Sequence, residues 1–154
     1  KFHFLPNRKS KARDLARVIE DIPYKNICIK FNGITIPADY ITDFASIPDG
    51  VVWFMHPNSK KVRMASLGHD LIWDEREYFQ RKLGLSGHEL KKLSNKEFRM
   101  RCMADGVDRF RAYIMYVILQ YHPKANRWFW DVENNFGRLD LGLDDIDRSH
   151  ALPI

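Results

Sequence analysis

The sequence predicts a single α+β domain in which a small antiparallel sheet packs on two main helices. The chain has 154 residues, of which 45% are hydrophobic, enough for one ordinary core and too few for two independent domains. Short extended runs around an Asn-Gly pair occupy its first third, and long stretches with helical spacing follow. We therefore expect a core domain at 26–121, between a basic arm or short helix at 1–25 and an aromatic, then acidic, extension at 122–154.

The N-terminal arm is rich in positive charge. Its basic residues are Arg8, Lys9, Lys11, Arg13 and Arg17. Before Asp131 the chain has 23 basic and 14 acidic residues, a net charge of +9, and from Asp131 onward it has two basic and six acidic residues, a net charge of −4. Nucleic acid is one partner for such an arm, but no nucleic-acid motif accompanies it, so a solvated face is the favoured interpretation. The alternation of charged and apolar residues from Ser10 to Ile19 predicts a short helix.

A β-hairpin is predicted next. Strands at Asn26–Phe31 and Ile34–Ile36 flank Asn32-Gly33, two residues that accept the positive φ angles of a type I′ turn. Pro37 has no N–H to donate to a strand ladder and ends the second strand. Tyr40–Thr42 is expected to resume an extended course.

Two long helices are predicted in the second half of the chain. The first runs from about Ser59 to Leu83, and Gly84 closes it. Ser94 with Glu97 has the pattern of a capping box, which predicts the start of a helix that runs to about Tyr121. This second helix has two apolar stripes and is expected to be covered on two sides. The stripes are Met103, Val107, Phe110, Ile114, Val117 and Tyr121, and Phe98, Cys102, Asp105, Ala112 and Tyr116.

The two cysteines point to a reduced protein. Cys28 and Cys102 form no CxxC pair, so neither a zinc ribbon nor a redox site is indicated, and both are expected to act as small buried apolar residues. No apolar run is long enough to predict a membrane span.

The candidate site combines one histidine with polar residues from three separate stretches. The candidates are Asp43, Ser46, His69, Asp70 and Asp105. If Asp43 and Asp105 approach His69, an imidazole and carboxylates converge. That set of ligands suits a divalent metal that holds a water for hydrolysis, with His69, Asp43 and Asp105 as ligands. Without a metal the same groups suit acid–base catalysis.

From the residue chemistry alone, a purely structural interpretation is favoured over a metal or hydrolytic centre. Asp43 can cap the turn that it begins, and Ser46 can cap a following segment. His69 can bond Asp43 or Asp105 and so lock a helix to a loop. A His-Asp dipeptide alone does not separate this interpretation from a metal or hydrolytic centre.

Three stretches resemble a family of small phage and prophage proteins classed as a domain of unknown function. They are Thr42-Asp43-Phe44-Ala45-Ser46-Ile47-Pro48, the segment Ala65–Trp73 with His69-Asp70, and the segment Arg101–Phe110 with Ala104-Asp105. The resemblance covers roughly 34–121 and implies a bacteriophage origin. It also places the five candidate residues at the family's polar signature positions, but it implies no activity.

Two function classes follow. In the first, the protein is an assembly or accessory component of a virion tail or neck, its partners are other phage structural proteins, and Arg127-Trp128-Phe129-Trp130 is an interface. The alternative is a metal-assisted phage hydrolase that acts on peptidoglycan or a phosphoester through the His69 centre. Either protein is expected in the virion or in the host cytoplasm.

Overall fold

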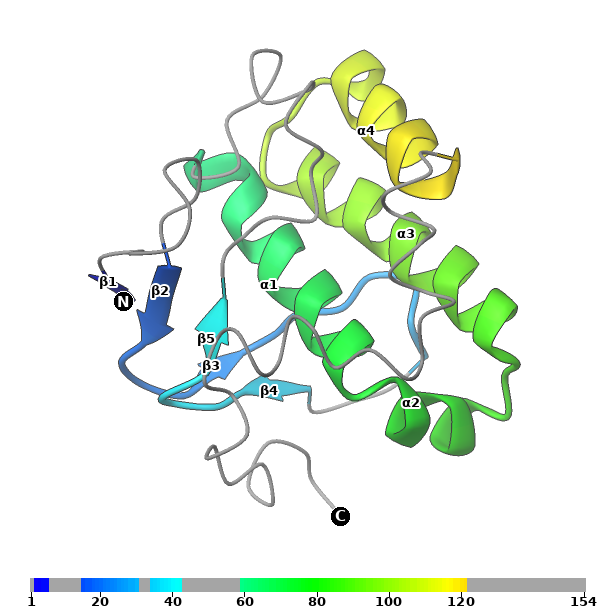
Figure 1. Cartoon of the computed structure of the whole chain (residues 1–154). Coiled ribbons are helices and arrows are strands. Elements are labelled where there is room, and N and C mark those ends of the chain that lie inside the picture. Colours follow the sequence, from blue (N-terminus) through cyan, green and yellow to red (C-terminus); the bar gives the residue numbers. More distant parts are fainter. Residues whose placement is uncertain (1, 6–14, 31–33, 43–58, 122–154) are drawn as a thin grey trace.

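Helix α1 lies between the strands and the remaining long helices, as Figure 1 shows for the computed structural model. The structure describes residues 2–5, 15–30, 34–42 and 59–121. The helices are α1 (Lys60–Asp74), α2 (Arg76–Leu83), α3 (Gly87–Ala104) and α4 (Arg109–Tyr121), and the strands are β1 (Phe2–Leu5), β2 (Leu15–Val18), β3 (Ile22–Pro23), β4 (Thr35–Ile36) and β5 (Ile41–Thr42). The predicted α+β class and single domain are confirmed.

The strands form two small antiparallel sheets. One has the order β1-β2-β5, with Ala16 opposite Thr42, and the other pairs β3 with β4, with Ile22 opposite Ile36. The second pairing continues for one residue beyond β3, because Tyr24 N donates to Ile34 O at 2.9 Å.

The helix predicted over 10–19 is wrong where the structure describes it, since residues 15–18 form β2. Ala16 and Val18 are fully buried, whereas Arg17 between them is exposed. This period of two is that of a strand. Although both buried residues precede the expected boundary at 26, they belong to the core.

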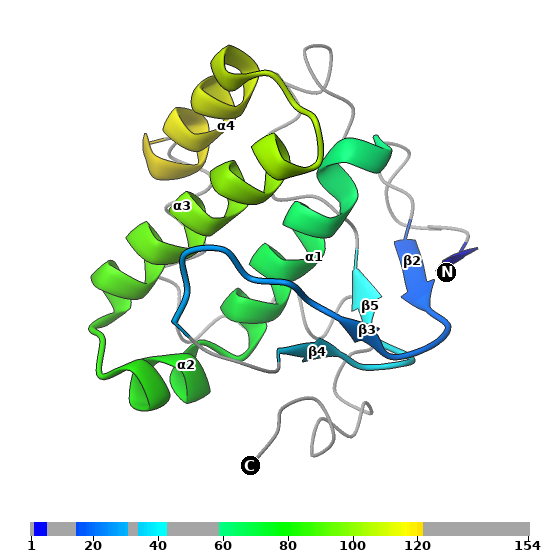
Figure 2. The same cartoon turned by 180° about the vertical axis from the view of Figure 1, so that it is seen from behind.

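The predicted first strand of the hairpin is also wrong. Residues 26–30 are not a strand, and the partner of β4 is β3 instead. Figure 2 shows the segment after β3 crossing α1 to reach α3. There the N–H groups of Ile27 and Cys28 donate to the carboxylate of Glu97, so they are not used in a ladder. The expected Asn32-Gly33 turn lies outside the described residues.

Both predicted helices are interrupted. The first breaks at Glu75 into α1 and α2, and α2 ends, as predicted, before Gly84, which has a φ of 66°. The second starts earlier, at Gly87, where Ser86 and Glu89 form the capping box. Ser94 and Glu97 lie inside α3 instead, and a turn around Gly106 separates α3 from α4.

The core has two parts. The first lies mainly between the strands, α1 and α2 and includes Val18, Tyr24, Ile36, Tyr40, Leu67, Leu71 and Phe79. The second lies between α1, α3 and α4 and includes Val62, Ala65, Phe98, Cys102, Ala112, Met115 and Leu119. Among the helices described here, none has both the length and the apolar character needed to cross a membrane.

Candidate functional site

His69 lies in the middle of α1 and is 5% exposed. Its ring meets Phe98 of α3 edge to face, with centroids 5.7 Å apart, and lies 5.8 Å from the ring of Trp73, one turn further along α1. As predicted, the imidazole therefore points into packed surface rather than into solvent.

The polar partners of His69 come from α1 and α3, and a further bond extends the set to α4. Its Nε2 is 2.9 Å from Asn95 Oδ1 and 3.0 Å from Trp73 Nε1. Asn95 Nδ2 in turn donates to Gln120 Oε1 at 2.8 Å, and Lys91 Nζ donates to the Gln120 carbonyl at 3.1 Å. We call these five residues the His69 network. It ties together three helices.

Burial keeps the imidazole of His69 neutral. Burial lowers the pKa of His69 to about 4, and the nearby Lys91 ammonium acts in the same direction, while the bond to Asn95 opposes them. With a proton on Nε2 the ring donates to Asn95, and with the proton on Nδ1 it accepts the N–H of Trp73. In both tautomers Nε2 is engaged by protein groups, so a metal could bind there only by displacing them.

The surroundings of the network leave little room for a substrate. A hollow of about 10 Å³ lies beside Trp73 and Lys91, which is about the space for one water molecule. In the part of the chain described, the network therefore resembles a packed structural element more than the floor of a cleft.

Asp70 and its neighbour one turn on, Asp74, bind hydroxyl groups from the strand side. Thr42 Oγ1 donates to Asp70 Oδ2 at 2.7 Å, and Tyr40 Oη donates to Asp74 Oδ2 at 2.8 Å. These carboxylates fix α1 to the segment that includes β5.

Asp105 is engaged elsewhere. It ends α3 and accepts two bonds from Arg101, at 2.7 and 3.0 Å. The next residue, Gly106, is level with Lys61, whose Nζ donates to its carbonyl. His69 lies eight residues further along α1, which is about 12 Å at the helical rise. The structure thus does not bring Asp105 to His69.

Metal binding by the predicted ligands stays a prediction. The described ranges contain no group of three or more His, Cys, Asp or Glu side chains placed to hold a metal. Asp43 and Ser46 lie outside these ranges, as does the expected interface at Arg127, Trp128, Phe129 and Trp130.

The sequence interpretation placed Glu97 in a capping box and missed its role as a fully buried carboxylate on α3. It accepts bonds from Ile27 N at 2.8 Å, Cys28 N at 2.7 Å, Cys28 Sγ at 3.0 Å and Tyr24 Oη at 3.3 Å. Four donors around one carboxylate explain how its burial is tolerated. The available signal was the position of this acidic residue next to Phe98 and near Ser94 and Cys102, which indicates a buried carboxylate.

Glu97 also makes Cys28 a poor nucleophile. Burial raises the pKa of the Cys28 thiol to about 12, and the hydrogen bond to the Glu97 carboxylate and its charge act in the same direction. Burial and the same carboxylate raise the pKa of Tyr24. Because the thiolate is the reactive form, this cluster favours anchoring over catalysis.

The family model described as protein of unknown function (DUF1353) matches residues 16–119. The chain belongs to this family. The DUF1353 match begins in β2 and ends in α4, so it includes the His69 network as far as α3, together with Glu97 and Asp105. Comparisons with curated proteins and with solved structures found no match.

Proposed function

We propose that this protein is a bacteriophage assembly or accessory component that binds a neighbouring virion subunit and does not catalyse a reaction. The single observation that carries the proposal is the outward face of α4, where large apolar side chains are exposed. The resemblance of the Asp43, His69-Asp70 and Ala104-Asp105 stretches to phage and prophage proteins supports the phage origin.

Helix α4 is apolar on two opposite faces. Ala112, Met115 and Leu119 are buried against the rest of the protein. On the other side Phe110 is 68% exposed, Tyr113 49% and Tyr121 71%. Since each residue turns a helix by about 100°, these three share one face with Ile114 and Val117. We call the five residues the outer stripe.

Phe110, Tyr113 and Tyr121 of the outer stripe are exposed, and Ile114 and Val117 between them are half-buried. For α4, this corrects the prediction that the helix expected from Ser94 to about Tyr121 is covered on two sides. A helix that is apolar all round is normally enclosed by protein. Large exposed apolar patches mark sites of association. The outer stripe is therefore the surface that a partner subunit would cover.

Arg99 and Tyr116 lie beside the outer stripe and contact its member Tyr113. The Arg99 guanidinium lies 5.1 Å from the ring centre of Tyr113 and 5.8 Å from that of Tyr116, and the two rings stack 6.5 Å apart. These residue types anchor many protein interfaces. Their mutual contact also holds them in place before a partner arrives, which lowers the entropy lost on binding.

The His69 network supports the same function. Through Gln120 it fastens the last turn of α4 to α1 and α3, so the outer stripe is held on a fixed support. A neutral, enclosed imidazole suits this task better than it suits the alternative, metal-assisted hydrolysis of peptidoglycan or a phosphoester.

The test is complementation of a phage or prophage that encodes this chain and from which the gene has been deleted. We expect the wild-type gene to restore infectious particles and the F110S/Y121S variant to fail, with unjoined or incomplete particles in electron micrographs. Ile19→Ser is the matched control, because Ile19 is 55% exposed but lies beyond β2. It should complement.

His69→Gln separates the two function classes. If the protein is an assembly component, this variant should complement at a temperature where its circular dichroism shows a folded chain. A folded H69Q variant that fails, together with an F110S/Y121S variant that complements, would refute the proposal and favour the hydrolase.

A further inference from the structure

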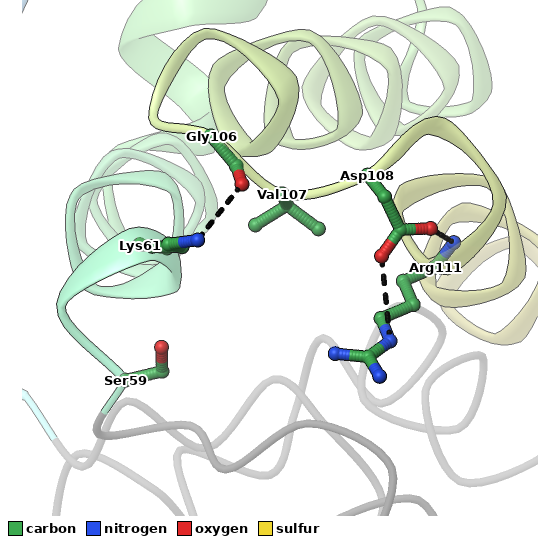
Figure 3. Close-up of a pocket in the computed structure, with 6 residues that line it drawn as sticks. All are labelled: Ser59, Lys61, Gly106, Val107, Asp108 and Arg111. Carbon is green, nitrogen blue, oxygen red and sulfur yellow. Dashed lines mark hydrogen bonds and ion pairs between the residues drawn. The ribbon is translucent and has the colours of Figure 1, made fainter.

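A second feature, separate from the outer stripe and from His69, is a hollow between the start of α1 and the turn that joins α3 to α4. Its volume is about 230 Å³, and the described residues that line it are Ser59, Lys61, Gly106, Val107, Asp108 and Arg111. Figure 3 shows Ser59 and Lys61 on one side and Asp108 and Arg111 on the other, with Val107 between them.

Among the described residues that line the hollow, positive charge and hydrogen-bond donors are in excess. Lys61 and Arg111 carry positive charges from two different helices, against one carboxylate, Asp108. Asp108 is engaged by Arg111 itself, since Oδ1 accepts from the Arg111 backbone N at 3.0 Å and Oδ2 lies 3.3 Å from Arg111 Nε. The carboxylate therefore acts mainly to orient the guanidinium.

Lys61 is held in place from the other side. Its Nζ donates to the Gly106 carbonyl at 3.1 Å, which uses one of the three ammonium protons. Gly106 has a φ of 90°, a value that a residue with a side chain rarely adopts. The turn thus presents its carbonyl to Lys61 and fixes the ammonium at the rim of the hollow.

We propose that this hollow binds the phosphoryl group of an organic phosphate. A phosphoryl group offers several acceptor oxygens and a negative charge, which match the ammonium of Lys61, the guanidinium of Arg111 and the hydroxyl of Ser59. The volume is larger than a single tetrahedral ion needs and leaves room for the group attached to the phosphorus. A free nucleotide and a nucleic-acid backbone are the two sources of such a group.

The test is a titration of the folded chain, labelled with ¹⁵N, with inorganic phosphate, adenosine 5′-monophosphate and a short thymidine oligonucleotide in separate arms. We expect the amide signals of Gly106 and Val107 to shift in the arms that bind. Lys61→Gln and Arg111→Gln should each weaken binding roughly tenfold, the effect of losing one charge-assisted hydrogen bond.

Lys60→Gln and Arg109→Gln are the matched controls. Each removes one positive charge from the same helix as a tested residue, at an exposed position that does not line the hollow. Both should bind within about twofold of the wild type. A stronger response to the nucleotide identifies a free organic phosphate, and a stronger response to the oligonucleotide identifies a nucleic-acid backbone.

Two results would overturn the proposal. One is the absence of shifts at Gly106 and Val107 in all three arms. The other is an equal loss of affinity in all four variants, which would show that diffuse positive charge attracts the phosphate. Thermal unfolding of each variant checks that the fold is intact, and the amide spectrum of the unliganded variant shows whether the turn keeps its structure.

Discussion

Gly68 of α1 lies directly against the ring of Tyr24. A Cβ built on Gly68 would come within 2.3 Å of both Cε2 and Cζ of that ring. Glycine inside a helix is less favourable than alanine by about 1 kcal/mol, so its presence here reflects the need for space. The contact lets Tyr24 lie across α1 and reach Glu97 on α3.

Gly68→Ala is therefore expected to destabilise the protein despite the better helix propensity of alanine. Overpacking of this kind typically lowers the free energy of unfolding by about 1–3 kcal/mol. Urea denaturation measures the change. In a Tyr24→Leu background the same substitution should cost much less, because the ring that it meets is gone. An equal cost in both backgrounds would contradict the steric explanation.

Glu97→Gln is expected to lower the free energy of unfolding by about 2–3 kcal/mol, because the amide places a donor where Ile27 N or Cys28 N now donates. Chemical denaturation gives the measurement. Glu77→Gln, on the exposed side of α2, is the control and should stay within about 0.5 kcal/mol of wild type. Equal stability of the two variants would show that Glu97 is not an anchor.

Alkylation rates test the environment of Cys28. Since burial and Glu97 raise the pKa of this thiol to about 12, its reaction with iodoacetamide at neutral pH should be slower than that of a free cysteine. The E97Q variant should react faster. Cys102, which is fully buried and whose pKa burial also raises to about 12, should stay unreactive in both, as followed by mass spectrometry. Rapid modification of Cys28 in the folded wild type would refute this prediction.

His69 makes stability depend on pH. Its pKa is about 6.5 in the unfolded chain and about 4 in the folded protein, so the unfolded state binds the proton first. The free energy of unfolding is therefore unaffected by protonation of His69 above pH 6.5, and it decreases as the pH falls from 6.5 toward 4. The total loss of unfolding free energy from this histidine is roughly 3 kcal/mol. Denaturation curves at several pH values measure it.

His69→Gln should remove this part of the pH dependence, so that its stability falls less steeply than that of the wild type between about pH 6.5 and pH 4. His88→Gln is the control, since His88 is exposed near the start of α3. A slope that H88Q lowers and H69Q leaves unchanged would contradict the assignment to His69.

Local sequence signals identified the helical character of residues 59–121 but not where the helices there begin and break, and the helix predicted over 10–19 was wrong. Gly84 ended α2 as expected, because the left-handed backbone conformation that closes a helix depends on the local preference of glycine. The capping-box pattern of Ser94 with Glu97 was used to predict a helix start, whereas Ser86 with Glu89, which has the same spacing, forms the capping box in the structure. Ser94 and Glu97 lie in mid-helix because Glu97 bonds residues about seventy positions away, which no pattern of spacing reveals.

The candidate site was predicted in part. His69 was expected to face packed surface, and it does. Its partner was sought in Asp43 or Asp105. Asp43 lies outside the described residues, Asp105 is bound by Arg101, and the described partner on α3 is the amide of Asn95. Asn95 and Gln120 do not titrate and have no motif, so only the packing of three helices could identify them. The strand predicted at 26–31 was wrong for a similar reason, because the N–H groups of Ile27 and Cys28 donate to Glu97 of α3 and not to a neighbouring strand.

The loop between β3 and β4 is joined to α3 through Glu97 and through Arg101, whose Nη1 donates to the Lys25 carbonyl at 3.1 Å. If this loop separated from α3, the buried Glu97 carboxylate would lose the donors that now satisfy it, which costs free energy. We expect the amides of β3, β4 and α3 to exchange with solvent in one cooperative opening event. The strands β3 and β4 and the helix α3 would then unfold as one unit.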